Sequence, residues 1–368
     1  MTKSTAAVLR AADGPFTVEE VTLDDPGPGE VLVKITAAGL CHTDLLTRHG
    51  LPLPMPVVVG HEGAGIVEQV GPGVTRLRPG DHVVLTFDSC GTCAHCLTGT
   101  PAYCDDFLPR NLTGVGAAGA GPGRPRMADR SGASVASRWF GQSSLAGHAI
   151  AAERNAVRVD EDLPLELLGP LGCGIQTGAG AVLEYLKPSS HSSVAVFGAG
   201  AVRLAAVMAA HAAGAREIIA VDLHESRREL ALELGATHAC DGADPDLAAR
   251  IRSWTGGGAD TALDTTGVSA VVGTALASLR NRGVCALVGA GGEIVLPPQI
   301  LSAGKVLTFL MEGDAVPQVF VPRLISLWRQ GRFPFDRLIR TYPLKAVNEA
   351  ENDRVAGLTV KPVLLMEH

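Results

Sequence analysis

Short runs of valine, isoleucine and alanine dominate the first part of the chain. They lie at 5–11, 31–38 and 57–70, and glycine and proline separate them, as in Gly71-Pro72-Gly73. Short apolar runs with this punctuation are typical of strands joined by tight turns. The pattern therefore predicts a β-rich domain. It also predicts a long surface loop at 113–138, where Gly, Ala, Arg and Ser replace the apolar pattern.

After about residue 173 the pattern changes to alternating strands and helices. It predicts strands at 194–197, 217–221, 261–263 and 284–288, an alanine-rich helix that stops at Gly214, and a second helix at 226–234. Such alternation predicts right-handed βαβ units around a parallel sheet. The alternation is lost from about residue 312, and the tail is expected to rejoin the first domain.

These two patterns predict two domains, in agreement with the length of 368 residues. We expect the first domain to comprise residues 1–173 and 312–368, and the second to comprise 174–311. Together they predict an α/β protein.

Composition and charge exclude several classes of protein. The net charge of −7 and the lack of a basic run argue against a nucleic-acid partner. No uninterrupted apolar stretch has the length of a membrane span, and the first residues lack the apolar core of a signal peptide. We therefore expect a cytoplasmic protein without a membrane partner.

Four of the eight cysteines are closely spaced in the sequence C-x2-C-x2-C-x7-C, namely Cys90, Cys93, Cys96 and Cys104. In a reducing compartment this spacing is typical of metal ligands rather than disulfides. Four thiolates complete a tetrahedral zinc shell and leave no position for a substrate, so we predict a structural zinc ion. An iron–sulfur cluster or unconnected thiols are the alternatives.

A catalytic zinc ion needs about three protein ligands and one open position. Cys41, His61 and Cys173 are candidates for such a site. Taken alone, a cysteine in an apolar run is more typical of a packed core residue than of a metal ligand. Together, and beside a predicted structural zinc site, they favour a second metal site.

The segment Gly60-His61-Glu62-x2-Gly65-x5-Gly71-x2-Val74 resembles the signature of the medium-chain zinc alcohol dehydrogenases. The resemblance extends from about Ala7 to the end of the chain, and residues 140–144 and 331–338 are most similar to the aryl (benzyl) alcohol dehydrogenase branch. It implies a GroES-like catalytic domain, a doubly wound Rossmann domain, and hydride transfer between a small-molecule alcohol and NAD.

The resemblance also implies roles for individual residues. The catalytic zinc ligands would be Cys41, His61 and Cys173. Glu62 would be a transient ligand, Asp44 would orient His61 and fix its tautomer, and Thr43 would take the alcohol proton. Many relatives carry a histidine five residues after the first zinc cysteine, where this chain has Leu46. The proton is therefore expected to leave from Thr43 through the cofactor ribose and water.

A dinucleotide site is predicted where the strand at 194–197 runs into Gly198 and Gly200 and then into a helix. Asp222 ends the next strand, about 20 residues on, as an acid that binds ribose hydroxyls does. It would repel a 2′-phosphate, which favours NAD over NADP. The resemblance adds further cofactor residues: His42 near the pyrophosphate, Arg227 near the ribose, and Thr177, Val202, Val288 and Ala290 around the nicotinamide.

Arg203 departs from the fingerprint, whose third position is normally Gly or Ala because the helix packs tightly on the strand there. An arginine fits only if the helix is displaced or the side chain turns aside. Phe309 also occupies a place where relatives often have a small residue. These two residues suggest an alternative. The chain would then be a zinc protein of the same fold with an impaired cofactor site, and it would act in redox-neutral chemistry or ligand binding.

The resemblance places Trp139 and Phe140 at the substrate pocket. Aromatic walls would suit a primary aromatic or allylic alcohol better than ethanol. The resemblance also implies a homodimer or a homotetramer.

Overall fold

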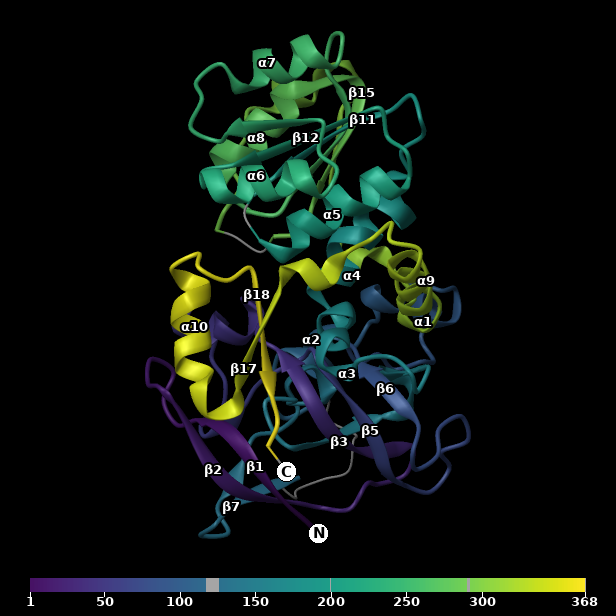
Figure 1. Ribbon diagram of the computed structural model, residues 1–368, viewed down its shortest axis with the longest axis vertical. Coiled ribbons are helices and arrows are strands. Elements are labelled where there is room, and N and C mark those ends of the chain that lie inside the picture. Colours follow the sequence, from purple (N-terminus) through teal and green to yellow (C-terminus); the bar gives the residue numbers. More distant parts are fainter. Residues whose placement is uncertain (117–125, 199, 290–291, 368) are drawn as a thin grey trace. The chain divides into compact units, whose positions relative to one another are not determined.

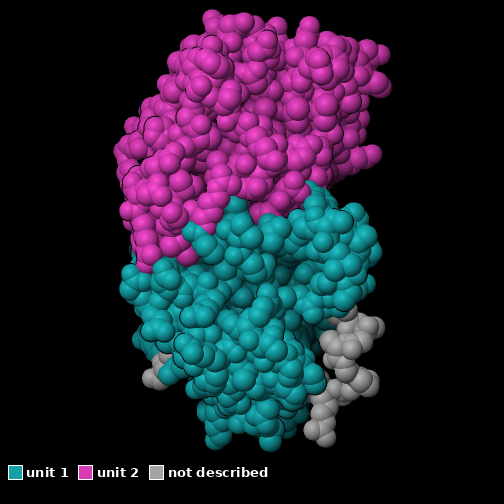
Figure 2. Space-filling view, turned by 90° about the vertical axis from the view of Figure 1, so that its right-hand side faces the viewer, with its two compact units in different colours: residues 1–173, 316–322, 338–368 teal, residues 174–315, 323–337 magenta. Residues whose placement is uncertain are grey.

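The computed structural model describes residues 1–116, 126–198, 200–289 and 292–367. It divides into two compact units (Figure 2). Unit 1 comprises Met1–Cys173, Val316–Pro322 and Leu338–His368, and unit 2 comprises Gly174–Ala315 and Arg323–Arg337. The chain therefore enters unit 2 twice and ends in unit 1.

Unit 1 is built on two β-sheets (Figure 1). One sheet has the order β4-β1-β2-β7-β8, and the other has the order β10-β6-β5-β3-β18-β17 with β9 also paired to β3. The strands are β1 (Thr2–Leu9), β2 (Phe16–Leu23), β3 (Glu30–Gly39), β4 (Val57–Val58), β5 (Gly63–Val70), β6 (His82–Leu85), β7 (Met127–Asp129), β8 (Ser134–Val135), β9 (His148–Ala152), β10 (Ala156–Val159), β17 (Ile339–Pro343) and β18 (Lys361–Leu365). The predicted β-rich domain is confirmed.

The C-terminal strand β18 pairs antiparallel with β3, with Val363 opposite Gly39. In Figure 1 the yellow strand β18 lies beside the purple strand β3, and β17 pairs with β18. This pairing brings Lys361, at the start of β18, to the end of β3, more than 300 residues earlier in the sequence. A side chain from the tail thereby reaches the segment that follows β3.

The prediction of a loop over 113–138 is wrong in part. Strands β7 and β8 form there and complete the edge of the five-stranded sheet, with β7 paired to β2. Met127 and Val135 are buried in this edge. Two short strands with few apolar residues gave no clear alternation in the sequence. Residues 117–125 of this segment lie outside the described part of the chain.

Unit 2 contains a six-stranded parallel sheet with the order β13-β12-β11-β14-β15-β16. Numbered within the unit, this is the order 3-2-1-4-5-6 of a doubly wound Rossmann sheet, as predicted. The strands are β11 (Ser193–Phe197), β12 (Glu217–Asp222), β13 (His238–Asp241), β14 (Ala259–Asp264), β15 (Leu279–Leu287) and β16 (Val306–Phe309).

The α-helices of both units are α1 (Ala94–Leu97), α2 (Phe107–Asn111), α3 (Leu165–Leu168), α4 (Gly174–Gly180), α5 (Ala201–Ala212), α6 (Glu225–Glu233), α7 (Leu247–Trp254), α8 (Ser269–Ser278), α9 (Pro317–Arg329) and α10 (Val347–Val355). Among the described residues, no helix combines the length and the apolar character that crossing a bilayer requires.

The alanine-rich sequence of α5 reflects its burial. Ala205, Ala206, Ala209 and Ala210 are all fully buried. Their small side chains let the helix backbone approach its neighbours closely, and Gly214 follows in a left-handed conformation with a φ of 78°. Gly178 of α4 packs on the same helix, because a Cβ added there would lie 1.9 Å from the carbonyl oxygen of Val202.

We predict that Gly178→Ala lowers the free energy of unfolding by about 1–3 kcal/mol, since an overpacked contact must displace backbone. Gly273→Ala in α8 is the control, because its added Cβ would meet only Leu296 Cδ2 at 3.7 Å. The control should be neutral or stabilising by up to about 1 kcal/mol, in line with helix propensity. Urea denaturation measures both, and equal stabilities would contradict the close contact.

Candidate functional site

Four potential metal ligands converge in unit 1, although they come from three separate segments. Cys41 lies just after β3, His61 and Glu62 lie between β4 and β5, and Cys173 follows a 3₁₀ turn at Gly169–Gly172. One ligand atom from each of the four lies within 4.8 Å of every other. His61 and Glu62 are fully buried. The predicted ligands Cys41, His61 and Cys173 are thus brought together.

The carboxylate of Asp44 holds this site in place. Its Oδ1 atom lies 2.7 Å from His61 Nδ1 and accepts hydrogen bonds from Gly60 N at 2.9 Å and Trp139 Nε1 at 2.9 Å. Its Oδ2 atom accepts a bond from Cys41 N at 2.9 Å. A carboxylate only accepts, so Nδ1 of His61 carries the proton. In the neutral imidazole, which is the form that binds a metal, Nε2 of His61 then carries the lone pair. Nε2 is buried without a hydrogen-bond partner in the described chain.

The thiol chemistry of this site also suits a metal. A hydrogen bond from Cys173 and the charge of Lys361 hold the pKa of Cys41 well below its usual range, against the effect of burial. A thiolate is the form that binds zinc. Two sulfurs and one unpartnered imidazole nitrogen make a three-ligand set that fits zinc with a position left open for substrate.

Glu62 forms a buried ion pair that the sequence did not predict. Lys361 Nζ lies 2.8 Å from Oε1 and 2.9 Å from Oε2 of Glu62. Burial raises the pKa of Glu62, and the charge of Lys361 opposes this effect. Burial alone would lower the pKa of Lys361, but the charge of Glu62 raises it to about 12. No local motif marks Lys361, because only the β3–β18 pairing brings it here.

Gly39 makes room for this ion pair. A Cβ added to Gly39 would lie 2.0 Å from Oε2 of Glu62, so a larger residue would displace the carboxylate.

Thr43 and His42 lie beside the site, at the start of the 3₁₀ helix Thr43–His49. Thr43 Oγ1 is 3.9 Å from Cys41 Sγ. His42 is open to solvent on part of its surface. Burial of the rest of the ring lowers the pKa of His42, and so does the charge of Arg354. Leu46 occupies the fourth position of the same helix.

The two aromatic residues predicted at the substrate pocket are both buried. The ring of Phe140 stacks on His61, with centroids 4.4 Å apart and an interplanar angle of 26°. Trp139 is 0% exposed and donates its indole N–H to Asp44. The bond to Asp44 gives Trp139 a structural link to the metal site that its position in the sequence did not reveal.

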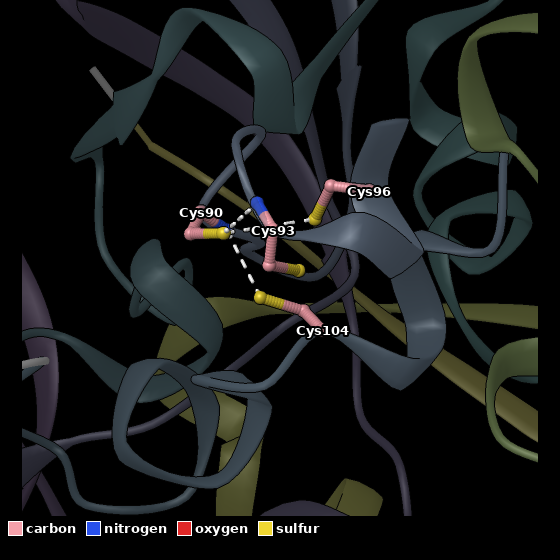
Figure 3. Close-up of side chains that lie close together, drawn as sticks. All are labelled: Cys90, Cys93, Cys96 and Cys104. Carbon is pink, nitrogen blue, oxygen red and sulfur yellow. Dashed lines mark hydrogen bonds between the residues drawn. The ribbon is translucent and has the colours of Figure 1, made fainter. Parts of the chain in front are cut away.

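The second cysteine group forms a compact cluster (Figure 3). The sulfurs of Cys90, Cys93, Cys96 and Cys104 lie within 4.8 Å of one another, and Figure 3 shows the four side chains converging. Hydrogen bonds from the backbone and hydroxyl of Thr92 lower the pKa of Cys90 to about 6. Four sulfurs in this arrangement fit one tetrahedral metal ion and offer no open position.

The glycine turn of the predicted dinucleotide site lies in unit 2, between β11 and α5. Gly198 and Gly200 have φ values of 114° and 147°, which only glycine adopts readily. A Cβ at Gly200 would meet no atom within 4 Å, so the backbone there is accessible to a ligand. Thr177 lies in α4 and Val202 in α5, and Val288 follows β15. Ala290 lies outside the described residues.

Asp222 ends β12, as predicted for the acid of such a site, and is 3% exposed. Its Oδ1 atom accepts a hydrogen bond from His224 N at 2.9 Å, whereas Oδ2 has no hydrogen-bond partner in the described chain. A buried carboxylate oxygen that accepts no hydrogen bond is suited to accept one from a hydroxyl of an adenosine ribose. Arg227, in the first turns of α6, is half-buried.

The side chain of Arg203 is 0% exposed. It lies 3.3 Å from Asp222 and donates a hydrogen bond to the carbonyl oxygen of Arg227 at 3.1 Å. Burial lowers the pKa of Arg203 to about 10, although the charge of Asp222 opposes this effect. Phe309 is 49% exposed and ends the edge strand β16.

Comparison with known protein families finds a matching family model for each unit. Residues 27–160 match the family model of the alcohol dehydrogenase GroES-like domain, and residues 201–324 match the zinc-binding dehydrogenase model. The expected GroES-like domain is thereby confirmed in unit 1.

Full-length relatives support the same assignment. The geraniol dehydrogenase of Castellaniella defragrans is 47% identical over 98% of this chain and 97% of its own length. Two solved structures match over all of both chains, an alcohol dehydrogenase zinc-binding domain protein from Burkholderia ambifaria with 49% identity and a TM-score of 0.96, and the benzyl alcohol dehydrogenase of Acinetobacter calcoaceticus with 42% identity and a TM-score of 0.92. This chain belongs to the zinc-dependent medium-chain alcohol dehydrogenase family and is an alcohol oxidoreductase.

Proposed function

We propose that this chain interconverts primary aromatic or allylic alcohols and their aldehydes, with NAD as the hydride carrier and two zinc ions per chain. The observation that carries the proposal is the buried convergence of Cys41, His61 and Cys173 around a fixed imidazole. Relatives named for geraniol, an allylic alcohol, and for benzyl alcohol, an aromatic one, support this substrate class.

Cys41, His61 and Cys173 would hold the catalytic zinc. When bound, this ion supplies a Lewis acid that lowers the pKa of an alcohol hydroxyl. Asp44 keeps the proton on His61 Nδ1, so that Nε2 of the neutral imidazole would be the nitrogen that binds the zinc. Cys90, Cys93, Cys96 and Cys104 would hold the second ion, whose role is structural.

Thr43 is the residue proposed to accept the alcohol proton. Its hydroxyl oxygen lies 3.9 Å from Cys41 Sγ. Because Leu46 has no titratable group, a side chain at position 46 cannot carry the proton onward, and the cofactor ribose and water would be its route from Thr43.

Glu62 would act as a transient ligand, and its ion pair sets the condition for that role. Lys361 donates to both carboxylate oxygens, so the ion pair would oppose movement of Glu62 toward a bound metal. It would thereby favour binding by three ligands, with a position open for alcohol.

Unit 2 would bind NAD, which supplies the hydride acceptor. Gly198 and Gly200 would admit the pyrophosphate close to the backbone. Oδ2 of Asp222 is ion-paired with Arg203 but accepts no hydrogen bond in the described chain, and it would accept one from a ribose hydroxyl. Arg227 would lie near the same ribose and His42 near the pyrophosphate. The nicotinamide contacts are proposed to come from Thr177, Val202, Val288 and Ala290.

Phe140 and Trp139 are proposed to shape the substrate pocket. Phe140 stacks on a proposed zinc ligand, so its ring is suited to contact the aromatic or allylic group of a bound alcohol.

We further propose that the chain is cytoplasmic, in keeping with its clustered free thiols, and forms a homodimer or homotetramer. The redox-neutral alternative gains no support from the relatives and is not proposed.

We predict that metal analysis of the purified chain finds about two zinc ions. Cys173→Ser should lose one of them and all turnover, and Cys104→Ser should lose the other and lower stability. Cys240→Ser, a buried thiol outside both clusters, is the control and should keep both ions. Iron with a visible chromophore in place of the second zinc would contradict the assignment.

We predict that kcat/KM for benzyl alcohol and geraniol exceeds that for ethanol by about 100-fold, since burying the larger apolar group adds about 25 cal/mol for each Å². Phe140→Ala should reduce this preference at least tenfold while the zinc content stays unchanged. Steady-state absorbance of the reduced nicotinamide measures the rates. Equal efficiencies for all three alcohols would rule out the proposed substrate class.

A further inference from the structure

Arg203 occupies a position that the dinucleotide fingerprint reserves for a small residue, and it is completely buried. Its guanidinium points toward the acid at the end of β12, with Nη2 3.3 Å from Oδ2 of Asp222. Nη2 also donates to the carbonyl oxygen of Arg227. The Nε and Nη1 groups of Arg203 have no hydrogen-bond partner in the described chain. The side chain therefore joins the first turn of α5 to β12 and to the start of α6.

The ion pair changes the charge that a cofactor meets at Asp222. A lone carboxylate at this position favours NAD because its negative charge repels the 2′-phosphate of NADP. Here the carboxylate and Arg203 both have 0% side-chain exposure, so water screens their interaction little. The pair is close to neutral toward a ligand, and the repulsion that excludes a 2′-phosphate is weakened.

Arg227 and Arg228, at the start of α6, supply two further guanidinium groups close to the end of β12. Arg228 donates to the carbonyl oxygens of Asp222 and Leu223, and it is 3.9 Å from Asp241. Arg227 is half-buried, and its Nε group has no hydrogen-bond partner in the described chain. Both arginines belong to the first turns of α6, whose amino end favours anions. The exposed Glu225 is the one acidic residue of that first turn.

We propose that Arg203 relaxes cofactor discrimination, so that this chain binds NADP with an affinity within about tenfold of its affinity for NAD. The inference rests on the proposed function, because it requires a dinucleotide in unit 2. Asp222 keeps Oδ2 available for a ribose hydroxyl of NAD, and Arg227 and Arg228 provide donors for the phosphate of NADP.

The test is a binding measurement that needs no turnover. Dissociation constants of NADH and NADPH are measured by nucleotide fluorescence on the zinc-replete full chain and on three variants. Arg203→Met removes the charge and keeps much of the volume, Arg203→Gly restores the fingerprint, and Arg203→Lys keeps the charge. Circular dichroism checks that each variant is folded.

We expect a ratio of Kd for NADPH to Kd for NADH below about ten in the wild-type chain and in Arg203→Lys. The ratio should rise at least tenfold in Arg203→Met and Arg203→Gly, because Asp222 is then uncompensated. A Kd ratio above about ten in the wild-type chain would overturn the inference, and so would an unchanged Kd ratio in a folded Arg203→Met. In either case, binding of NADH would still support the proposed function. Absence of binding by both nucleotides would overturn the proposed function and the inference together.

Discussion

The candidate metal site of unit 1 depends on the hydrogen bonds that the carboxylate of Asp44 accepts. Its two oxygens accept from four donors, and these belong to the segments that follow β3, precede β5 and precede β9. Burying a carboxylate costs free energy unless its oxygens are fully hydrogen-bonded. Loss of any one of the four bonds is therefore unfavourable, and this holds each donor in position. One side chain thereby fixes the backbone beside Cys41, the tautomer of His61 and the ring of Trp139.

The other buried charges of the two sites are likewise paired within a unit. In unit 1, Glu62 is compensated by Lys361, and in unit 2, Asp222 is compensated by Arg203. Removing one partner of such a pair leaves an uncompensated charge, which costs more than the pair itself contributes to stability. Both pairs lie beside a proposed ligand site. The pair at Glu62 restrains a carboxylate beside the proposed metal site, and the pair at Asp222 alters the charge offered to the proposed cofactor.

Much of the fold, and the two groups of side chains that converge as candidate metal ligands, could be predicted from the sequence, because their signals are local. The C-x2-C-x2-C-x7-C spacing, the Gly60–Gly65 signature and the strand–Gly–helix–Asp222 order all lie within short segments. Lys361 could not be found this way, since it reaches Glu62 only through the pairing of β18 with β3. Trp139 was expected at the substrate, but its N–H bond to Asp44 depends on packing between segments 95 residues apart. Strands β7 and β8 were missed because short edge strands carry little apolar pattern.

The most direct test of the central claim, that Asp44 prepares the site for zinc, is the zinc affinity of Asp44→Asn. The amide has nearly the same shape, but its NH₂ group cannot accept the bonds that one carboxylate oxygen accepts. We predict zinc binding about 10–100-fold weaker than wild type at the catalytic site, with the Cys90–Cys104 site unaffected, as metal competition titration would measure. Asp25→Asn, at an exposed carboxylate, should bind both ions as wild type does. Wild-type zinc affinity and turnover in Asp44→Asn would contradict the claim.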